Sequence, residues 1–339
     1  MWNRFAKTPG LLTAFGLTAA ILMLLSHGRG AAQTSDSGNI VSDVFTRNPL
    51  QVALLQWYPA NLVTSFAAGI GAERVAFDGA NIWVTNVGDA NNGTSVTKMS
   101  ANDGTLLGTF QVGEAPVGIA YDGANMWVSD YAGNKVSKVR ASDGAVVGKF
   151  PTGAGPGWVV FDGAHIWTSN YLDNNVTELR ATDGTMLANY TVGRNPAGIA
   201  FDGSHIWVVN ISGGNVTELN ATDGAVIGTF PVGTSPYDIA FDGTNMWVSN
   251  FGSNSLTELS GVNGSSLGTF TTGAKPYGVV YDGANIWVAN SGDNTVTKLR
   301  VSTGRNMGTF GVGANPNGVA FDGAHVWVAN NLSNTVSKL

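Results

Sequence analysis

The sequence predicts an all-β fold, a seven-bladed β-propeller with four-stranded blades, and three observations lead to it. A phrase of the form Phe/Tyr-Asp-Gly-x-Asn/His-Ile/Met/Val-Trp occurs seven times, and its last six copies follow one another every 40 residues. Each copy contains several short apolar runs, and repeats of this kind are typical of radial or stacked architectures. The seventh copy stops at Leu339, and the part it lacks is found near the other end of the chain.

The missing part corresponds to residues 62–69. Phe66 precedes Asp78 by the same number of residues as Phe110 precedes Asp122. A repeat permuted in this way places both chain ends in one sheet, which closes a ring and brings no advantage to an open solenoid. We therefore predict that 62–69 supplies the last strand of the seventh blade.

Each repeat is expected to contain four strands. In the fourth copy they are 199–201, 206–209, 216–219 and 226–230. The first two are almost continuously apolar, so both faces of their sheet must be covered. The outer two alternate polar and apolar residues, which suits a wetter rim. Asp223-Gly224 predicts a type I′ hairpin turn, with positive φ at both central residues. Sheets that cover one another in a ring are propeller blades.

Three kinds of side chain recur in every copy, and this repetition favours a role in the fold. They are the tryptophans Trp83, Trp127, Trp167, Trp207, Trp247, Trp287 and Trp327, the aspartates Asp78, Asp122, Asp162, Asp202, Asp242, Asp282 and Asp322, and the second-strand ends Asn86, Asp130, Asn170, Asn210, Asn250, Asn290 and Asn330. The tryptophans suit packing between blades better than a ring of binding platforms. The aspartates are interpreted as turn formers and the strand ends as turn caps. His165, His205 and His325 replace a turn asparagine, and both types tolerate left-handed backbone.

Composition restricts the function. The 339 residues include no cysteine, which excludes disulfides, thiolate nucleophiles and cysteine-bound metals. The net charge of −6 and the low charged fraction of 12% disfavour nucleic acid and anionic lipid as partners. We find no Ser–His–Asp arrangement, phosphate-binding loop or metal triad in the sequence.

Residues 1–32 are predicted to be a signal peptide. Arg4 and Lys7 form a basic start, 11–25 an apolar stretch, and 30–32 a small-residue cleavage site. The apolar stretch is shorter than the roughly 20 residues that span a bilayer, although retention as an N-terminal anchor stays open. We therefore expect a secreted or periplasmic protein, a monomer that is free of the membrane after cleavage.

The rest of the chain divides into two parts. Residues 33–59 are expected to be a leader that ends in a short helix, because Asn48-Pro49 resembles an N-cap followed by proline at the first helical position. Residues 60–339 are expected to form the propeller.

Several phrases resemble those of known propellers. Ile82-Trp83-Val84-Thr85-Asn86, Ile286-Trp287-Val288-Ala289-Asn290 and Val232-Gly233 ahead of Pro236 resemble the YVTN-type repeats of YncE-like seven-bladed propellers, over residues 60–339. This resemblance implies a secreted or periplasmic binding protein. The P-x-G-I-A and D-G-x-I-W-V phrases are similar to those of streptogramin lyases, and NHL-type and gluconolactonase-like propellers are also related. The lyase resemblance implies a metal held by His and Glu near the channel mouth, but no His stands at the corresponding strand starts.

Candidate site residues are those that break the repeat where a propeller binds its ligands, at one mouth of the central channel. Four residues before each repeated Asp, four copies have Gly and three do not, and the residue before that position also varies. These departures place Glu73, Arg74, Trp158, Tyr237, Asp238, Tyr277 and Asn317 around one mouth. Aromatic faces with a few polar groups suit a small polar or sugar-like ligand or a short peptide. The alternative is a solvated rim with aromatics over the blade junctions.

Two functions remain open. The first is a non-catalytic propeller, without a cofactor, that binds a small polar ligand or a protein partner at the mouth. The alternative is a metal-assisted lyase or lactonase of the streptogramin-lyase or gluconolactonase type, with Glu73 and Asp238 as base or metal ligands. A Ca²⁺ or Mg²⁺ ion held by Asp130, Asn170, Glu73 and waters is a further possibility, because oxygen ligands suit these ions.

Overall fold

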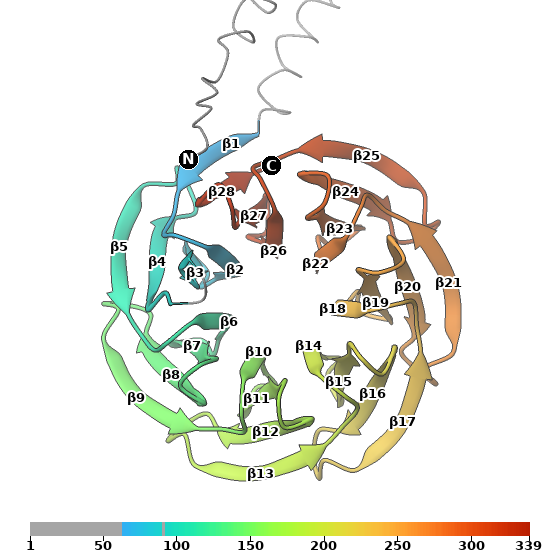
Figure 1. Cartoon of the computed structure of the whole chain (residues 1–339), viewed down its shortest axis with the longest axis horizontal. Coiled ribbons are helices and arrows are strands. Elements are labelled where there is room, and N and C mark those ends of the chain that lie inside the picture. The colour runs from blue at the N-terminus through green and yellow to red at the C-terminus, as the bar shows by residue number, and fades with distance from the viewer. Residues whose placement is uncertain (1–62, 90–91) are drawn as a thin grey trace, which may run out of the picture. The chain divides into compact units, whose positions relative to one another are not determined.

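The computed structural model describes residues 63–89 and 92–339, which form seven four-stranded antiparallel sheets around a central channel (Figure 1). The predicted seven-bladed β-propeller is confirmed. No helix of the described residues is long and apolar enough to cross a membrane. The predicted signal peptide and the helix after Asn48-Pro49 lie outside the described residues.

The blades follow one another along the chain, and in each the first strand faces the channel and the fourth lies at the rim (Figure 1). Blades 1 to 3 are β2 (Ala72–Phe77), β3 (Asn81–Asn86), β4 (Ser95–Ser100), β5 (Leu106–Gln111); β6 (Pro116–Tyr121), β7 (Asn125–Asp130), β8 (Lys135–Arg140), β9 (Val146–Pro151); β10 (Pro156–Phe161), β11 (His165–Asn170), β12 (Asn175–Arg180), β13 (Met186–Thr191). Blades 4 to 6 are β14 (Pro196–Phe201), β15 (His205–Asn210), β16 (Asn215–Asn220), β17 (Val226–Pro231); β18 (Pro236–Phe241), β19 (Asn245–Asn250), β20 (Ser255–Ser260), β21 (Ser266–Thr271); β22 (Pro276–Tyr281), β23 (Asn285–Asn290), β24 (Thr295–Arg300), β25 (Asn306–Gly311). Blade 7 is β26 (Pro316–Phe321), β27 (Val326–Asn330), β28 (Thr335–Lys338) and β1 (Thr64–Ala67).

The ring closes through β1, as predicted. This strand pairs antiparallel with β28, with Phe66 opposite Val336. The Phe66 ring lies 5.6 Å from that of Trp327, and in the other blades the corresponding aromatic ring lies 5.2 to 5.7 Å from its tryptophan. The N-terminal strand therefore replaces, residue for residue, the strand that the seventh copy lacks.

The predicted strands are present, but most extend beyond their apolar runs. The first strand of blade 4 begins at Pro196 rather than at Ile199, and the second continues to Asn210. Backbone pairing continues through these polar or small residues, while the apolar pattern marks only the segment buried on both faces. Every first strand also contains a register shift, which in blade 4 lies between Pro196 and Ile199.

The prediction of a type I′ turn at Asp223-Gly224 is wrong. Only Gly224 has positive φ, at 69°, and the Gly224 N–H donates to the Asn220 carbonyl at 2.8 Å. The turn is therefore longer than two residues. The glycine has a second reason to recur, because a Cβ at Gly224 would lie 1.9 Å from the Tyr190 ring of the preceding blade. The Asp-Gly repeat thus permits the close approach of neighbouring blades.

The repeated tryptophans pack each blade against the next, and the repeated aspartates hold the tryptophans in place. Trp207 is fully buried and packs in one cluster with Ile239 and Met246 of the next blade. Its indole N–H donates to Asp202 Oδ2 at 2.8 Å, and Asp202 Oδ1 accepts backbone N–H groups of the turn. Burial alone would raise the pKa of Asp202, but the hydrogen bonds from Trp207 and the backbone lower it. The aspartate is thus both a turn former and an anchor for the indole.

Three of the second-strand ends, Asn86, Asn250 and Asn290, bond to the link from the preceding blade rather than to their own turn. Asn86 Oδ1 accepts the Gly69 N–H at 3.1 Å, and Asn250 Oδ1 accepts the Gly233 N–H at 3.0 Å. In both pairs the glycine belongs to the link from the preceding blade. The asparagine Nδ2 donates to a hydroxyl of its own third strand, as Asn86 does to Thr97 at 2.9 Å. In these three copies the predicted turn cap is therefore a bridge between blades, whereas Oδ1 of Asp130, Asn170, Asn210 and Asn330 has no hydrogen-bond partner among the described residues.

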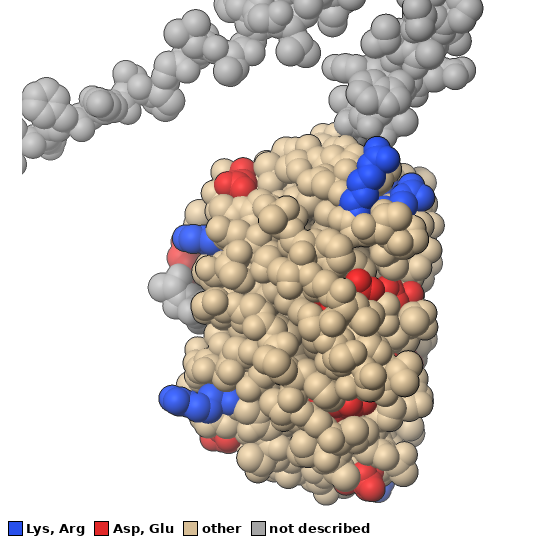
Figure 2. All heavy atoms as spheres, turned by 90° about the vertical axis from the view of Figure 1, so that its right-hand side faces the viewer, with Lys and Arg blue, Asp and Glu red and all other residues tan. Residues whose placement is uncertain are grey.

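The rim is wetter and carries exposed apolar side chains. In blade 4 the fourth strand begins with Val226 and Ile227, which are 56% and 51% exposed. The side of the molecule in Figure 2 shows scattered acidic and basic residues among mostly uncharged ones. That face presents no extended patch of one charge.

Candidate functional site

A bulge in each first strand determines where the candidate residues point. In blade 1 the register shift lies between Ala72 and Val75, so one extra residue is inserted at Glu73-Arg74. A regular strand directs successive side chains to opposite faces, whereas a bulge re-aims one of them. Glu73 and Arg74 consequently both make contacts with distant blades. Tyr237 and Asp238 occupy the same bulge in blade 5.

Hydroxyl groups of the second strands fix the bulges. The Arg74 N–H donates to Thr85 Oγ1 at 3.0 Å, and that hydroxyl donates to the Val117 carbonyl of the next blade at 2.8 Å. The Asp238 N–H donates to Ser249 Oγ at 3.0 Å, and Ser249 likewise reaches a carbonyl of blade 6. The backbone that carries the site is therefore held by neighbouring blades.

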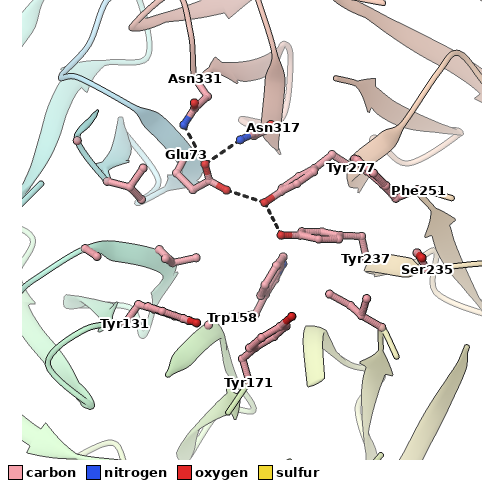
Figure 3. Close-up of a pocket in the computed structure, with 16 residues that line it drawn as sticks. Glu73, Tyr131, Trp158, Tyr171, Ser235, Tyr237, Phe251, Tyr277, Asn317 and Asn331 are labelled. Carbon is pink, nitrogen blue, oxygen red and sulfur yellow. Dashed lines mark hydrogen bonds between the residues drawn. The ribbon is translucent and has the colours of Figure 1, made fainter. Parts of the chain in front are cut away.

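Glu73 is the centre of one hydrogen-bond network (Figure 3). Tyr277 Oη lies 2.8 Å from Glu73 Oε1, and the amides of Asn317 and Asn331 donate to Oε2 at 2.7 and 3.1 Å. Tyr277 Oη also lies 2.8 Å from Tyr237 Oη. Because a phenol has one proton, donation from Tyr277 to the carboxylate leaves it accepting from Tyr237. The network joins blades 1, 5, 6 and 7 and confirms that Asn317 lies beside Glu73.

Arg74 and Asp238 form the second network, a buried ion pair across the ring. Arg74 Nη1 lies 2.8 Å from Asp238 Oδ2, and the side chains are 8% and 10% exposed. The Trp158 indole donates to Asp238 Oδ1 at 3.0 Å, and Arg74 Cζ lies 4.2 Å above the Trp158 ring. Burial alone would lower the pKa of Arg74, but the charge of Asp238 raises it, so the guanidinium stays charged. Blades 1, 3 and 5 thus meet through three side chains.

The repeated glycines at this position make room for the residues that replace them in the following blade. A Cβ at Gly198 would lie 2.6 Å from Asp238 Cα, and one at Gly318 would lie 2.7 Å from Arg74 Cα. A Cβ at Gly118 would lie 2.9 Å from Trp158 Cα. The glycines are therefore required by close backbone approach between blades.

A cavity of about 660 Å³ opens at this mouth (Figure 3). Its lining combines aromatic, aliphatic and amide side chains from several blades: Glu73, Val87, Gly88, Ala115, Val117, Tyr131, Gly157, Trp158, Tyr171, Ile211, Ser235, Tyr237, Phe251, Tyr277, Asn317 and Asn331. Five of the seven predicted site residues are among them. Arg74 and Asp238 do not line the cavity, but they are buried and hold Trp158 in place.

Sequence reasoning missed part of this lining. Tyr131, Tyr171, Phe251 and Asn331 directly follow the repeated residue that ends each second strand. Across the seven blades this next position reads Val87, Tyr131, Tyr171, Ile211, Phe251, Ser291 and Asn331. It is variable beside a nearly constant one, which is the signal that identified the first-strand residues. Applied to both strands, the same comparison would have found these residues.

The lining carries one acidic side chain. Burial raises the pKa of Tyr237 to about 12 and, with Glu73 close by, raises that of Tyr277 well above its usual value. Both phenols are therefore neutral at physiological pH. Glu73 is the one acidic or basic side chain among the residues that line the cavity. The Arg74–Asp238 pair behind it is balanced in charge.

Asp130 is buried and only partly satisfied. Its Oδ2 accepts from Ser137 at 2.6 Å, whereas Oδ1 has no hydrogen-bond partner in the described part of the chain. Burial raises the pKa of Asp130 to about 6, against the opposing effects of Ser137 and nearby lysines. Asp130 does not line the cavity, and the ion site predicted with Asn170 and Glu73 stays a prediction.

One cluster with mixed histidine and carboxylate groups lies away from the cavity. Asp202, His205 and Glu218 bring one ligand atom each within 4.8 Å of the others. His205 Nδ1 lies 3.0 Å from Asp202 Oδ2, where Asn81 Nδ2 donates to Asp78 in blade 1. The histidine therefore replaces the turn asparagine in its contact with the aspartate. The left-handed backbone expected from the sequence is wrong, because His205 begins strand β15 and its φ is not positive.

Comparison with known proteins identifies the fold and no closer relationship. No family model matches the chain, and no curated protein matches it. Among solved structures, the Kuenenia stuttgartiensis hydrazine synthase has a TM-score of 0.69 and 17% identity and is covered over 95% of its chain and 79% of this one. A streptogramin B lyase has a TM-score of 0.70 and 17% identity, over 96% of its chain and 82% of this one. The virginiamycin B lyase from Staphylococcus aureus has a TM-score of 0.70 and 16% identity, over 98% of its chain and 82% of this one.

At such identity the likeness establishes the fold alone. The resemblance to streptogramin lyases is confirmed at the level of the propeller, whereas membership of the YncE-like group is not. The lining of the cavity offers one carboxylate, Glu73, and no histidine. It does not fit the His and Glu metal site that the lyase resemblance implies.

Proposed function

We propose that this protein is a non-catalytic binding protein that takes a small polar ligand with apolar faces at the mouth of its channel. The cavity of about 660 Å³ carries the proposal. Its volume lies within the range of typical ligand pockets, and such pockets combine apolar walls with a few fixed polar groups. Residues that break the repeat line it, so they are not part of the packing that every blade shares.

The site is prepared for a ligand before binding. Glu73, Asn317 and Asn331 hold one another in one arrangement, and Trp158 is fixed by its bond to Asp238. Rigid polar and aromatic groups lose little freedom on binding, which favours affinity. The rings of the lining offer flat apolar faces, against which a sugar or another small ring can stack.

The alternative, a metal-assisted lyase or lactonase, rests on the shared fold with streptogramin B lyases. It would use Glu73 and Asp238 as base or metal ligands. Glu73 accepts three hydrogen bonds from neighbouring side chains, and Asp238 is engaged by Arg74, Trp158 and backbone N–H groups. Both carboxylates are occupied in holding the structure, so binding is the better-supported function.

We further propose a monomer that acts outside the cytoplasm, in the secreted or periplasmic space, on the strength of the predicted signal peptide. The same proposal includes membership of the YncE-like group, because the resemblance to that group implies a binding protein outside the cytoplasm. A protein partner at the mouth would be the principal competitor of a small ligand.

The test uses full-length protein. Native mass spectrometry reports any molecule that co-purifies, and a thermal-shift screen of small polar compounds identifies ligands. Hits are then titrated against Tyr171→Ala, with Leu172→Ala as the matched control, because Leu172 is 57% exposed and does not line the cavity. We expect Tyr171→Ala to weaken binding at least about tenfold, as loss of an aromatic contact commonly does, and Leu172→Ala to leave it unchanged. Equal binding by both variants would place the ligand elsewhere.

A further inference from the structure

The charge of the cavity restricts the ligand that it can take. Glu73 is the one acidic or basic side chain of the lining, and its carboxyl group is held by two amides and a phenol rather than by a cation. The nearby guanidinium of Arg74 is balanced by Asp238 at 2.8 Å. The net charge of the whole chain, −6, has the same sign as this carboxylate. The acidic group that the lining presents to a ligand therefore favours a cation.

Aromatic side chains are the most numerous kind in the walls. Six rings line the cavity: Tyr131, Trp158, Tyr171, Tyr237, Phe251 and Tyr277. Aromatic faces attract cations through the ring quadrupole. The molecule uses this attraction already, since Arg74 Cζ lies 4.2 Å from the Trp158 ring and 5.0 Å from that of Tyr277. Lys275 Nζ lies 5.8 Å from the Phe251 ring.

Two of the six rings are free of such partners. Within residues 63–89 and 92–339, Tyr131 and Tyr171 take part in no aromatic pair and no cation–π contact, and both are partly exposed. Figure 3 shows them, together with Trp158, on the side of the cavity opposite Glu73. The cavity therefore presents open aromatic faces on one side and a carboxylate on the other.

We propose that the ligand of this cavity is an organic cation, a substituted ammonium whose apolar groups contact Tyr131, Tyr171 and Trp158 and whose charge is balanced by Glu73. This rests on the proposed function and names the class of ligand. Neutral rings would use the same walls but would gain nothing from the carboxylate. The recognition of alkylated ammonium groups by aromatic cages follows the same physical chemistry.

Arg74, like the exposed Lys275 beside Phe251, is a feature that would favour an anion. Its Nε and Nη2 have no hydrogen-bond partner among the described residues. They are nevertheless buried, and Arg74 does not line the cavity. An anion in the cavity would approach Glu73 without direct access to the guanidinium. The experiment therefore includes an anionic probe of the same shape.

Three probes of one shape and different charge test the proposal on the full-length protein. They are choline, its neutral isostere 3,3-dimethylbutan-1-ol, and the anion 3,3-dimethylbutanoate, each titrated by calorimetry. We expect choline to bind at least about tenfold more tightly than the alcohol, and the carboxylate more weakly than either. Glu73→Gln should remove most of the advantage of choline and change the affinity for the alcohol less than about twofold.

Tyr171 supplies a second set of variants that does not disturb the Glu73 network. Tyr171→Phe keeps the ring and should bind choline as the wild type does, whereas Tyr171→Leu should weaken it about fivefold. Equal affinities for choline and the alcohol, tighter binding of the carboxylate, or no binding of choline at tens of millimolar would each overturn the cationic class. A neutral or anionic hit from the screen that Tyr171→Ala abolishes would reject the cation and retain the binding site.

Discussion

The blade interfaces and the channel mouth satisfy their polar groups in opposite ways. At the interfaces, each repeated side chain bonds to its own blade or the adjacent one, as Trp207 does to Asp202 and Asn250 to the link at Gly233. At the mouth, the side chains that break the repeat bond across the ring. Arg74 of blade 1 pairs with Asp238 of blade 5, which also holds Trp158 of blade 3.

This difference separates scaffold from site. Contacts that recur seven times can be made by identical sequences, so every blade contributes the same packing and the same turn. Contacts across the ring need different residues at equivalent positions, since a ring of identical arginines would only repel. The mouth is therefore where the repeat must be broken to create a pocket of mixed character, and the predictions below compare the two regions.

The largest effect is expected at a blade interface. Trp207→Ala removes a fully buried ring and its bond to Asp202, and should lower the free energy of unfolding by about 3–5 kcal/mol. Trp158→Ala at the mouth, where the ring is only partly buried, should cost less. Chemical denaturation of both variants measures the difference. A loss below about 1 kcal/mol for Trp207→Ala would contradict its packing role.

Arg74→Met should have the next largest effect. It leaves the buried carboxylate of Asp238 without its counter-charge, and breaking such a pair by removing one partner costs about 3 kcal/mol or more. The double variant Arg74→Met/Asp238→Asn should recover at least about 1 kcal/mol, because the uncompensated charge is removed. If the single and double variants unfold at the same denaturant concentration, the charges of Arg74 and Asp238 do not contribute to stability as a pair.

Gly198→Ala tests the glycines beside the mouth. The added Cβ would lie 2.6 Å from Asp238 Cα, and forced overpacking should destabilise by about 1–3 kcal/mol. Gly311→Ala is the matched control in another strand, since its Cβ would meet no atom within 4 Å and should change stability by less than about 0.5 kcal/mol. Thermal and chemical melts of the two variants suffice. Similar melts would show that the backbone can shift without cost.

The smallest effect is expected for Asp130→Asn, and its sign is stabilising. Burial raises the pKa of Asp130 from about 4 in the unfolded chain to about 6, so the folded state holds the extra proton between these values and stability falls as pH rises through them. Asparagine does not ionise and so removes this loss of stability. The variant should be more stable than the wild type by about 1 kcal/mol at pH 8 and nearly equal to it at pH 4.

The same variant bears on the predicted ion site. Titration with millimolar Ca²⁺ or Mg²⁺ should stabilise the wild type and not Asp130→Asn if Asp130 holds an ion with Asn170 and Glu73. An identical response of the two proteins would remove Asp130 from any ion site, while its effect on the pH dependence of stability would stand.

Most of the fold follows from the sequence, because a repeat imposes one solution many times. The number of blades, the strand that closes the ring and the packing role of Trp207 were all predictable from spacing and residue type. The turn at Gly224 was not, because Asp-Gly also suits the longer turn that the Gly224 N–H and the Asn220 carbonyl close. Nor was the reason for the glycine, since a Cβ there would meet the Tyr190 ring of the preceding blade. Local turn preferences carry no information about that neighbour.

The candidate site was partly predictable for the same reason. Departures from the repeat identified Glu73 and the residues around it, because a constant background makes a change visible. They could not show that Arg74 pairs with Asp238, 164 residues away, or that Arg74 lies behind the cavity rather than in it. The sequence by itself determined which residues differ. The tertiary structure decided which of them meet, since the curvature of the closed ring and the bulges of its first strands bring distant blades to one point.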